Sequence, residues 1–130
     1  MNNIVCDSNI WIAFFNEEDN QHEKARELIG LLEQQEKPLL LTNYIDLECI
    51  TILLKRKGIQ ASQRWIRFRS DAKRIEQLTF DKEDHNAITE LFLKGNNKHL
   101  SFIDISLIFL ATNNNQVYTF DNKLQNALSS

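Results

Sequence analysis

The sequence predicts an α/β fold built on a parallel sheet. Short apolar runs of strand length alternate along the chain with longer segments in which apolar residues recur at helical spacing, and strands that alternate with helices pair in parallel. A length of 130 residues, with 42% hydrophobic and 25% charged residues, is typical of one globular domain with a buried core. We therefore expect a single domain over residues 1–130.

The first part of the chain predicts two strands and two helices. The expected strands are residues 3–6 and 39–41, and the expected helices are residues 22–33 and 43–57. The first strand, "NIVC", stops at Asp7, and the second, "LLL", follows Pro38. The first helix has an apolar face at 3.6-residue spacing. The second ends at Gly58 after a basic last turn, which the helix dipole favours.

The second part of the chain continues the alternation. We expect helices at 60–70, 81–94 and 101–112, strands at 75–78 and 117–120, and a short terminal helix. Asp81 suits the cap of its helix, with Glu83 and Asp84 in the first turn. The three asparagines at 113–115 end the next helix, and the strand "VYTF" stops at Asp121.

The helix at 101–112 contains an unexpected charge. Its segment "SFIDISLIFLA" is apolar on all sides except for Asp104, and a helix of this kind is usually buried. A buried carboxylate is unfavourable unless it is paired or binds a metal. Asp104 is therefore a candidate for a functional site.

Four carboxylates are expected at one end of the sheet. Asp7 and Asp121 each follow a strand directly, and ligands of open α/β sheets bind outside the carboxyl ends of the strands. Glu48 lies one turn inside the helix after the second strand, and Asp104 lies in the first turn of the helix before the last strand. Converging carboxylates repel one another unless a cation lies among them. Because all the ligands are oxygens, Mg²⁺ or Mn²⁺ suits them better than zinc.

Three of these acids also have a purely structural explanation. Asp104 stands three residues after Ser101, which is the spacing of a capping box, and Asp121 can cap the terminal helix. Glu48 can pair with Lys55 or another base on an exposed helix face. Taken singly, each of these residues is as well explained by structure as by function.

The structural explanation is weakest for Asp7 and strongest for Asp46, an aspartate outside the set of four. No local feature of the expected elements requires an acid at Asp7, so Asp7 has the weakest structural explanation. Asp46 stands three residues after Asn43, and helix capping is expected to explain it fully.

Four segments resemble, in order and spacing, the motifs of PIN-domain nucleases. The segments are "IVCDSNIWIAFF", "LLLTNYIDLECITILL", "LSFIDISLIFLA" and "VYTFDNKL", and they extend over nearly the whole chain. The chain length is similar to that of the small VapC-type toxins of bacterial and archaeal toxin–antitoxin pairs. The resemblance implies a three-layer α/β/α sandwich with about four parallel strands. The family's final edge strand is expected to be missing, because the chain ends nine residues after Asp121.

The resemblance also implies the residues of the site. The four acids of the family correspond to Asp7, Glu48, Asp104 and Asp121, which are expected to bind Mg²⁺ or Mn²⁺ and to hydrolyse RNA phosphodiester bonds. Three neighbouring polar residues, expected to orient these carboxylates, are Thr119, Ser8 and Asn9. A small antitoxin protein and a second copy of the chain are the protein partners that the resemblance implies.

Basic residues are concentrated in one segment of an acidic protein. Residues 55–74 hold eight basic residues and one acid, whereas the other 110 residues hold seven basic and seventeen acidic ones. Such a segment suits an RNA substrate or a protein partner. The RNA-binding candidates are Lys55, Arg56, Lys57, Arg64, Arg67 and Arg69. Trp65 and Phe68, three residues apart on a helix, are expected to pack in the core.

Cysteine usage and hydropathy favour the cytoplasm, and the resemblance implies that of a bacterium or archaeon. Cys6 and Cys49 do not make a disulfide framework and are expected to be buried free thiols. No apolar run approaches the roughly 18 residues of a membrane span, and the N-terminal segment lacks the basic region of a signal peptide.

Single sequence features argue against several other functions. An aspartate-nucleophile phosphohydrolase requires a second Asp at position 9, where this chain has Asn9, and a receiver domain requires an acidic pair that "NIVC" does not offer. The sequence has no glycine-rich phosphate loop. A catalytically idle binding module of the same fold and a nuclease that processes RNA without being a toxin stay open.

Overall fold

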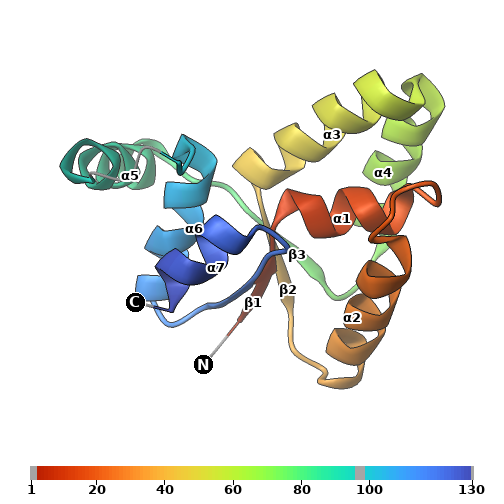
Figure 1. Ribbon diagram of the computed structural model, residues 1–130, viewed down its shortest axis with the longest axis horizontal. Helices are drawn as coiled ribbons and strands as arrows, with labels where there is room; N and C mark the ends of the chain where they lie inside the picture. Colours follow the sequence, from red (N-terminus) through yellow and green to blue (C-terminus); the bar gives the residue numbers. More distant parts are fainter. Residues whose placement is uncertain (1–2, 96–98, 130) are drawn as a thin grey trace.

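A parallel sheet lies between two layers of helices (Figure 1). The computed structural model describes residues 3–95 and 99–129. The strands of this part of the chain are β1 (Ile4–Cys6), β2 (Leu39–Thr42), β3 (Ile75–Leu78) and β4 (Gln116–Tyr118). Their order is β3-β2-β1-β4, and every neighbouring pair is parallel. The prediction of an α/β fold with about four parallel strands is confirmed.

Seven helices in the described residues cover the sheet. They are α1 (Ser8–Phe15), α2 (His22–Gln34), α3 (Asn43–Lys57), α4 (Ile59–Asp71), α5 (Lys82–Lys94), α6 (Phe102–Thr112) and α7 (Asn122–Leu128). Figure 1 shows α1 to α4 on one side of the sheet and α5 to α7 on the other. The sequence also predicts a loop at 95–99, of which residues 96–98 lie outside the described residues. None of the described helices has the length and apolar character needed to cross a membrane.

Helix α1 was not predicted, and its presence changes the interpretation of Asp7. Asp7 is the N-cap of α1, and its carboxylate accepts a hydrogen bond from the Ser8 backbone N–H at 2.7 Å. The expectation that no local feature requires an acid at this position is therefore wrong. Helix α1 itself contributes the buried residues Ile10, Trp11 and Ala13 to the core. The polar residue that follows β1 therefore begins a core helix.

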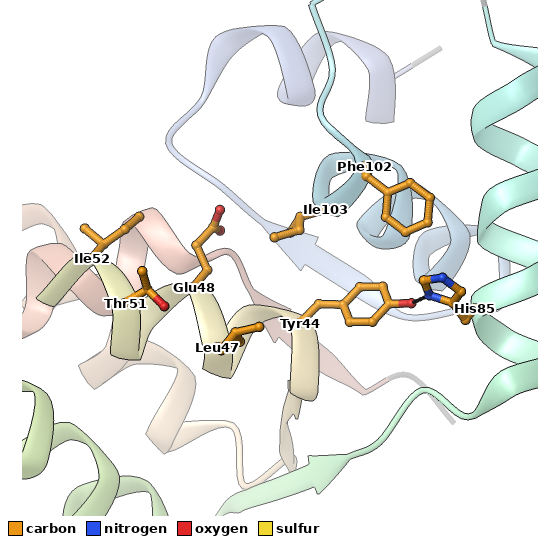
Figure 2. Close-up of a pocket in the computed structure, with 8 residues that line it drawn as sticks. All are labelled: Tyr44, Leu47, Glu48, Thr51, Ile52, His85, Phe102 and Ile103. Atoms are coloured by element: carbon orange, nitrogen blue, oxygen red, sulfur yellow. Dashed lines mark hydrogen bonds between the residues drawn. The ribbon is translucent and has the colours of Figure 1, made fainter. Parts of the chain in front are cut away.

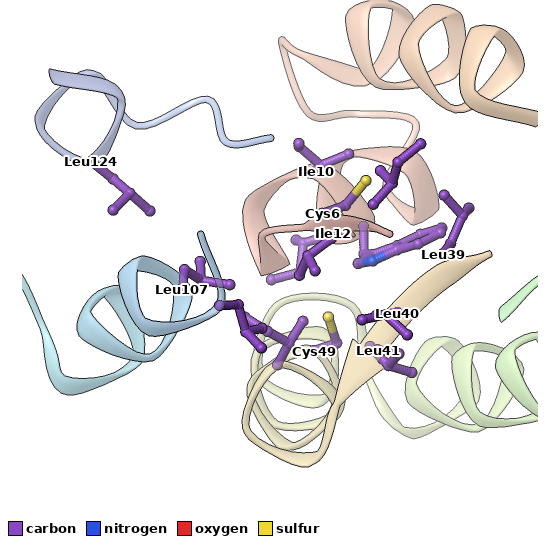
Figure 3. Close-up of a cluster of buried hydrophobic side chains, with 14 of the residues drawn as sticks. Cys6, Ile10, Ile12, Leu39, Leu40, Leu41, Cys49, Leu107 and Leu124 are labelled. Atoms are coloured by element: carbon purple, nitrogen blue, oxygen red, sulfur yellow. The ribbon is translucent and has the colours of Figure 1, made fainter. Parts of the chain in front are cut away.

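The core lies between β1, β2 and the helices packed against them (Figure 3). Ile4, Val5 and Leu41 are at most 1% exposed, as expected for strands that are covered on both faces. Cys6 and Cys49 are buried free thiols, as predicted. Burial, aided by the charge of Asp7, raises the pKa of Cys6 to about 12, so the neutral thiol packs as an apolar group and does not supply a thiolate ligand.

An aromatic cluster joins α1 to α4. The cluster consists of Trp11, Phe14, Phe15, Trp65 and Phe68, whose contacting rings have centroids 5.1 to 6.2 Å apart. Trp65 is fully buried, and Phe68 packs against the core. The prediction that both are core residues is therefore confirmed.

Asp46 connects α3 to α4 and does not cap α3. The N-cap of α3 is Thr42, whose hydroxyl accepts a hydrogen bond from the Ile45 N–H at 3.1 Å. Asp46 instead accepts hydrogen bonds from Trp65 Nε1 at 2.9 Å and from Arg69 Nε at 3.0 Å. The capping interpretation of Asp46 is wrong, because its partners lie on another helix.

Candidate functional site

The candidate site begins where β1 and β4 end side by side. Cys6 pairs with Tyr118 in the sheet, and the Asp7 backbone N–H donates to the Tyr118 carbonyl at 2.9 Å. β4 is shorter than predicted, so Thr119 is the first residue beyond it. In the sheet, β1 lies between β2 on one side and β4 on the other, so the strand order reverses at β1. This is the point of an open α/β sheet at which a ligand crevice is expected.

Asp7 is a buried carboxylate with neutral hydrogen-bond donors. It is 5% exposed and accepts hydrogen bonds from the Thr119 hydroxyl at 2.7 Å, from the Ser8 N–H at 2.7 Å and from Asn9 Nδ2 at 3.4 Å. Burial raises the pKa of Asp7 to about 6, and the charges of Asp104 and Glu48 add to the rise. The hydrogen bonds from Thr119 and Ser8 oppose it but do not cancel it.

Glu48 is connected to Asp7 through Ser8. The Ser8 hydroxyl donates to Glu48 Oε1, and its oxygen lies 3.5 Å from Asp7 Oδ1. Glu48 takes no part in the ion pairs found among the described residues, so pairing with Lys55 does not explain it. Helix α3 begins directly after β2, and this arrangement brings Glu48 to the carboxyl end of the sheet.

Asp104 forms the capping box that its spacing allows, and it also faces the site. Its Oδ2 accepts from the Ser101 N–H at 2.9 Å, while the Ser101 hydroxyl accepts from the Asp104 N–H at 3.1 Å. Its charge adds to the raised pKa of Asp7, so the two carboxylates lie within electrostatic range of each other. The structural and the functional explanations of Asp104 are therefore compatible.

Asp121 lies at the margin of the site. Its Oδ1 accepts from the Lys123 N–H at 3.0 Å, so Asp121 caps α7. Its backbone N–H donates to the Thr119 hydroxyl oxygen at 3.1 Å, and Asn9 Nδ2 donates to the same oxygen at 3.1 Å. Thr119 thus connects Asp121 to Asp7, but Asp121 is not among the charges that raise the pKa of Asp7.

The chemistry of these side chains fits a hard divalent cation. Asp7, Glu48 and Asp104 supply only oxygen atoms as possible ligands. Their negative charges repel one another, and a bound cation would neutralise that repulsion. In their present positions, no three acidic, histidine or cysteine side chains of the described residues are close enough to form a finished metal site. The residue types therefore fit Mg²⁺ or Mn²⁺, while the arrangement is not a closed coordination shell.

The basic segment at 55–74 divides into paired and exposed residues. Lys57 forms an ion pair with Glu18, and Arg69 forms one with Asp46 in which both side chains are 17% exposed. The remaining candidates are exposed: Lys55, Arg56, Arg64 and Arg67. Of these, Lys55 lies two helical turns after Glu48 on the same face of α3, roughly 10 Å further along the axis.

A groove between α3, α5 and α6 opens beside Glu48 (Figure 2). Its volume is about 400 Å³, and its lining includes Tyr44, Leu47, Glu48, His85, Phe102 and Ile103. The Tyr44 hydroxyl is hydrogen-bonded to His85 Nδ1. Sequence analysis did not predict this groove, although the aromatic residues Tyr44 and Phe102 lie four and two residues before two of the acids.

Comparison with known proteins agrees with this arrangement. The PIN domain family model matches residues 4–127. VapC20 of Mycobacterium tuberculosis, a toxin that cleaves the sarcin–ricin loop, superposes with a TM-score of 0.82 at 20% identity over 95% of this chain and 94% of its own. VapBC2 of Rickettsia felis, bound to a DNA fragment from its promoter, gives a TM-score of 0.56 at 15% identity over 91% and 98%.

A search of curated proteins found no match to the sequence. The family model nevertheless extends over almost the whole chain, from the first residue of β1 into α7. The two structural neighbours have the same fold. The chain belongs to the PIN-domain family.

Proposed function

We propose that this protein is a metal-dependent endoribonuclease and the toxin of a toxin–antitoxin pair. The observation that carries the proposal is the environment of Asp7, which is buried at the carboxyl end of the sheet with the charges of Glu48 and Asp104 beside it and only neutral donors around it. Membership of the PIN-domain family and the likeness to the RNA-cleaving toxin VapC20 support the same conclusion.

The side chains of the site have distinct roles in this proposal. Asp7, Glu48 and Asp104 hold the metal, and Asp121 completes its surroundings. When bound, Mg²⁺ or Mn²⁺ would lower the pKa of a water molecule and neutralise charge on the scissile phosphate. Thr119 and the Ser8 N–H fix the orientation of the Asp7 carboxylate, and the Ser8 hydroxyl fixes that of Glu48.

RNA and protein partners follow from the same proposal. Lys55, on the Glu48 face of α3, is exposed, as are Arg64 and Arg67 of α4, and these cations suit RNA phosphates. The VapBC2 neighbour supports a small antitoxin partner. The resemblance to VapC-type toxins also suggests a homodimer in the cytoplasm.

Metal dependence and two charge-removing variants test the proposed function. We expect protein treated with EDTA to be inactive on RNA, Mg²⁺ or Mn²⁺ to restore cleavage, and Ca²⁺ to restore it poorly because it is larger and tolerates looser geometry. Asp7→Asn and Asp104→Asn should each lower the cleavage rate by about 100-fold or more, the order found when one group that stabilises the transition state is removed.

The Asn side chain at position 104 keeps an oxygen that can accept from Ser101, so Asp104→Asn removes the charge without removing the cap. Asp71→Asn, on the exposed end of α4, is the matched control and should cleave like the wild type. Undiminished cleavage in EDTA, or full activity of either site variant, would refute the proposed function.

A further inference from the structure

The groove beside Glu48 is continuous with the carboxylate site. Glu48 lines the groove, and the same side chain is hydrogen-bonded to Ser8 next to Asp7. Figure 2 shows Glu48 between Thr51 and Ile52 on one side and Ile103 on the other, with the Tyr44–His85 pair at the far end of the lining. When a molecule reacts at the carboxylates, the part of that molecule next to the reacting atoms can therefore reach the groove.

The walls of the groove at its outer end are aromatic rings held by packing from behind. Tyr44 and Phe102 have centroids 6.1 Å apart, and His85 and Phe102 have centroids 5.5 Å apart. Phe80 supports Tyr44 at 4.8 Å, and Phe92 supports Phe102 at 5.4 Å. Rings that are fixed in this way can stack with a planar ligand at little entropic cost.

The described lining of the groove offers hydrogen-bonding groups but no lysine or arginine side chain. Burial and the charge of Asp84 raise the pKa of Tyr44, so the phenol keeps its proton and can donate a hydrogen bond to His85 Nδ1. In that arrangement the remaining imidazole proton is on Nε2. Among the described residues that line the groove there is no lysine or arginine. The groove thus suits a flat, uncharged group with a polar edge and does not suit a phosphate.

We propose that the groove binds an unpaired nucleobase of the RNA substrate, adjacent to the scissile phosphate. The base stacks against Phe102 and Tyr44, and His85 hydrogen-bonds to its edge, which is how proteins read bases that are splayed out of single-stranded RNA. This inference rests on the proposed nuclease function. It adds that cleavage depends on the nucleotide that flanks the cut.

Abasic substrates test the proposal against a groove variant. In an RNA whose cut site has been mapped with the wild type, the nucleotides on either side are replaced one at a time by an abasic ribose. We expect kcat/KM to fall about tenfold or more at one of the two positions, in line with the loss of base stacking. Phe102→Leu should cause a similar fall on the intact RNA and little further fall on the abasic one.

The combination of the two changes is the informative measurement. If the penalties of Phe102→Leu and of the abasic position multiply, the base does not occupy the groove and the proposal is refuted. The same holds if Phe102→Leu cleaves like the wild type but associates less with a co-expressed antitoxin or with a second copy, since the groove is then a protein interface. Leu93→Ala, an exposed apolar residue of α5 outside the groove lining, is the control and should change neither readout.

Binding without catalysis separates this proposal from the proposed function. Short single-stranded RNA is titrated in EDTA while the His85 ring resonances, assigned with His85→Gln, are followed by NMR. Shifts of these resonances in a protein that never cleaves RNA would support the groove and refute the nuclease. Efficient cleavage with no shift of His85 would support the nuclease and refute the groove.

Discussion

Two regions of the molecule withdraw an aspartate from solvent in opposite ways. Between α3 and α4, Asp46 receives hydrogen bonds from Trp65 and from the guanidinium of Arg69, so its charge is matched within the fold. At the carboxyl end of the sheet, Asp7 receives only neutral donors, and its pKa is raised first by burial and further by the charges of Asp104 and Glu48. A carboxylate with an internal cation is explained by structure, whereas one surrounded by other carboxylates requires a cation from outside.

The first prediction concerns how the free energy of unfolding of the metal-free protein depends on pH. The pKa of Asp7 is raised from 3.8 to about 6 by folding, so the folded protein binds this proton more tightly than the unfolded chain. Its charge therefore destabilises the folded state above pH 6, and the effect is relieved as the pH falls from about 6 to 4. At about 1.4 kcal/mol per pKa unit, the cost at pH 7 is at most about 3 kcal/mol.

Urea denaturation of the wild type and of Asp7→Asn in EDTA, between pH 4 and pH 7, measures this term. The difference in free energy of unfolding between the two proteins should shift in favour of Asp7→Asn as the pH rises, and Mg²⁺ should stabilise only the wild type. The variant loses part of the hydrogen bonding of Asp7, so its net gain at pH 7 should be about 1 kcal/mol. If the free energies of unfolding of the two proteins change in parallel with pH, the charge of Asp7 does not destabilise the folded state and the prediction is wrong.

The second prediction concerns the matched charge of Asp46. Asp46→Asn leaves Arg69 without its anion at a site where both side chains are 17% exposed. We expect a loss of about 2 kcal/mol in free energy of unfolding, between the values for exposed and for fully buried pairs. RNA cleavage should be unchanged at temperatures where the variant is folded.

Arg69→Gln is the companion variant. Because both changes break the same pair, the double variant should lose clearly less stability than the two single losses added together. Additive losses, or a loss of cleavage in folded Asp46→Asn, would remove the distinction between the two aspartates.

Local sequence signals predicted the sheet and six of the helices, and the two failures have different causes. The polar residues after β1 were interpreted as a stop, whereas Asp7 caps a helix whose apolar residues Ile10, Trp11, Ala13 and Phe14 already have helical spacing. Asp46 was explained by its distance from Asn43, but its partners come 19 and 23 residues later. The first error overlooked a local helix signal, whereas the second replaced a tertiary arrangement by a local one.

The approach of three carboxylates was predictable from topology alone, since the carboxyl ends of neighbouring parallel strands meet at one edge. For Asp121 the sequence allowed both a ligand and a cap of the terminal helix, and its marginal place reflects the capping contact that the structure shows. The pairing of Tyr44 with His85 was not predictable, since it joins two helices 41 residues apart in sequence.

The smallest expected effect concerns the arginines of α4. Arg64 and Arg67 are exposed, whereas Arg69 is bound to Asp46. If the segment at 55–74 carries RNA, the double variant Arg64→Gln/Arg67→Gln should raise KM a few-fold at low salt with kcat little changed, which is the sign of lost uniform binding. The dependence of log KM on log salt should flatten by about 0.7 for each lost phosphate contact on single-stranded RNA.

Arg69→Gln is the matched control, because it removes the same charge from the same helix but at a position already neutralised by Asp46. It should lower the free energy of unfolding and leave the salt dependence of KM unchanged. If the segment instead binds a protein, the double variant should cleave RNA like the wild type but elute from size-exclusion chromatography with less co-expressed antitoxin or as a smaller oligomer. A double variant that matches the wild type in both assays would show that these arginines only keep the α4 surface solvated. The functional cations would then have to lie nearer to Glu48, beginning with Lys55.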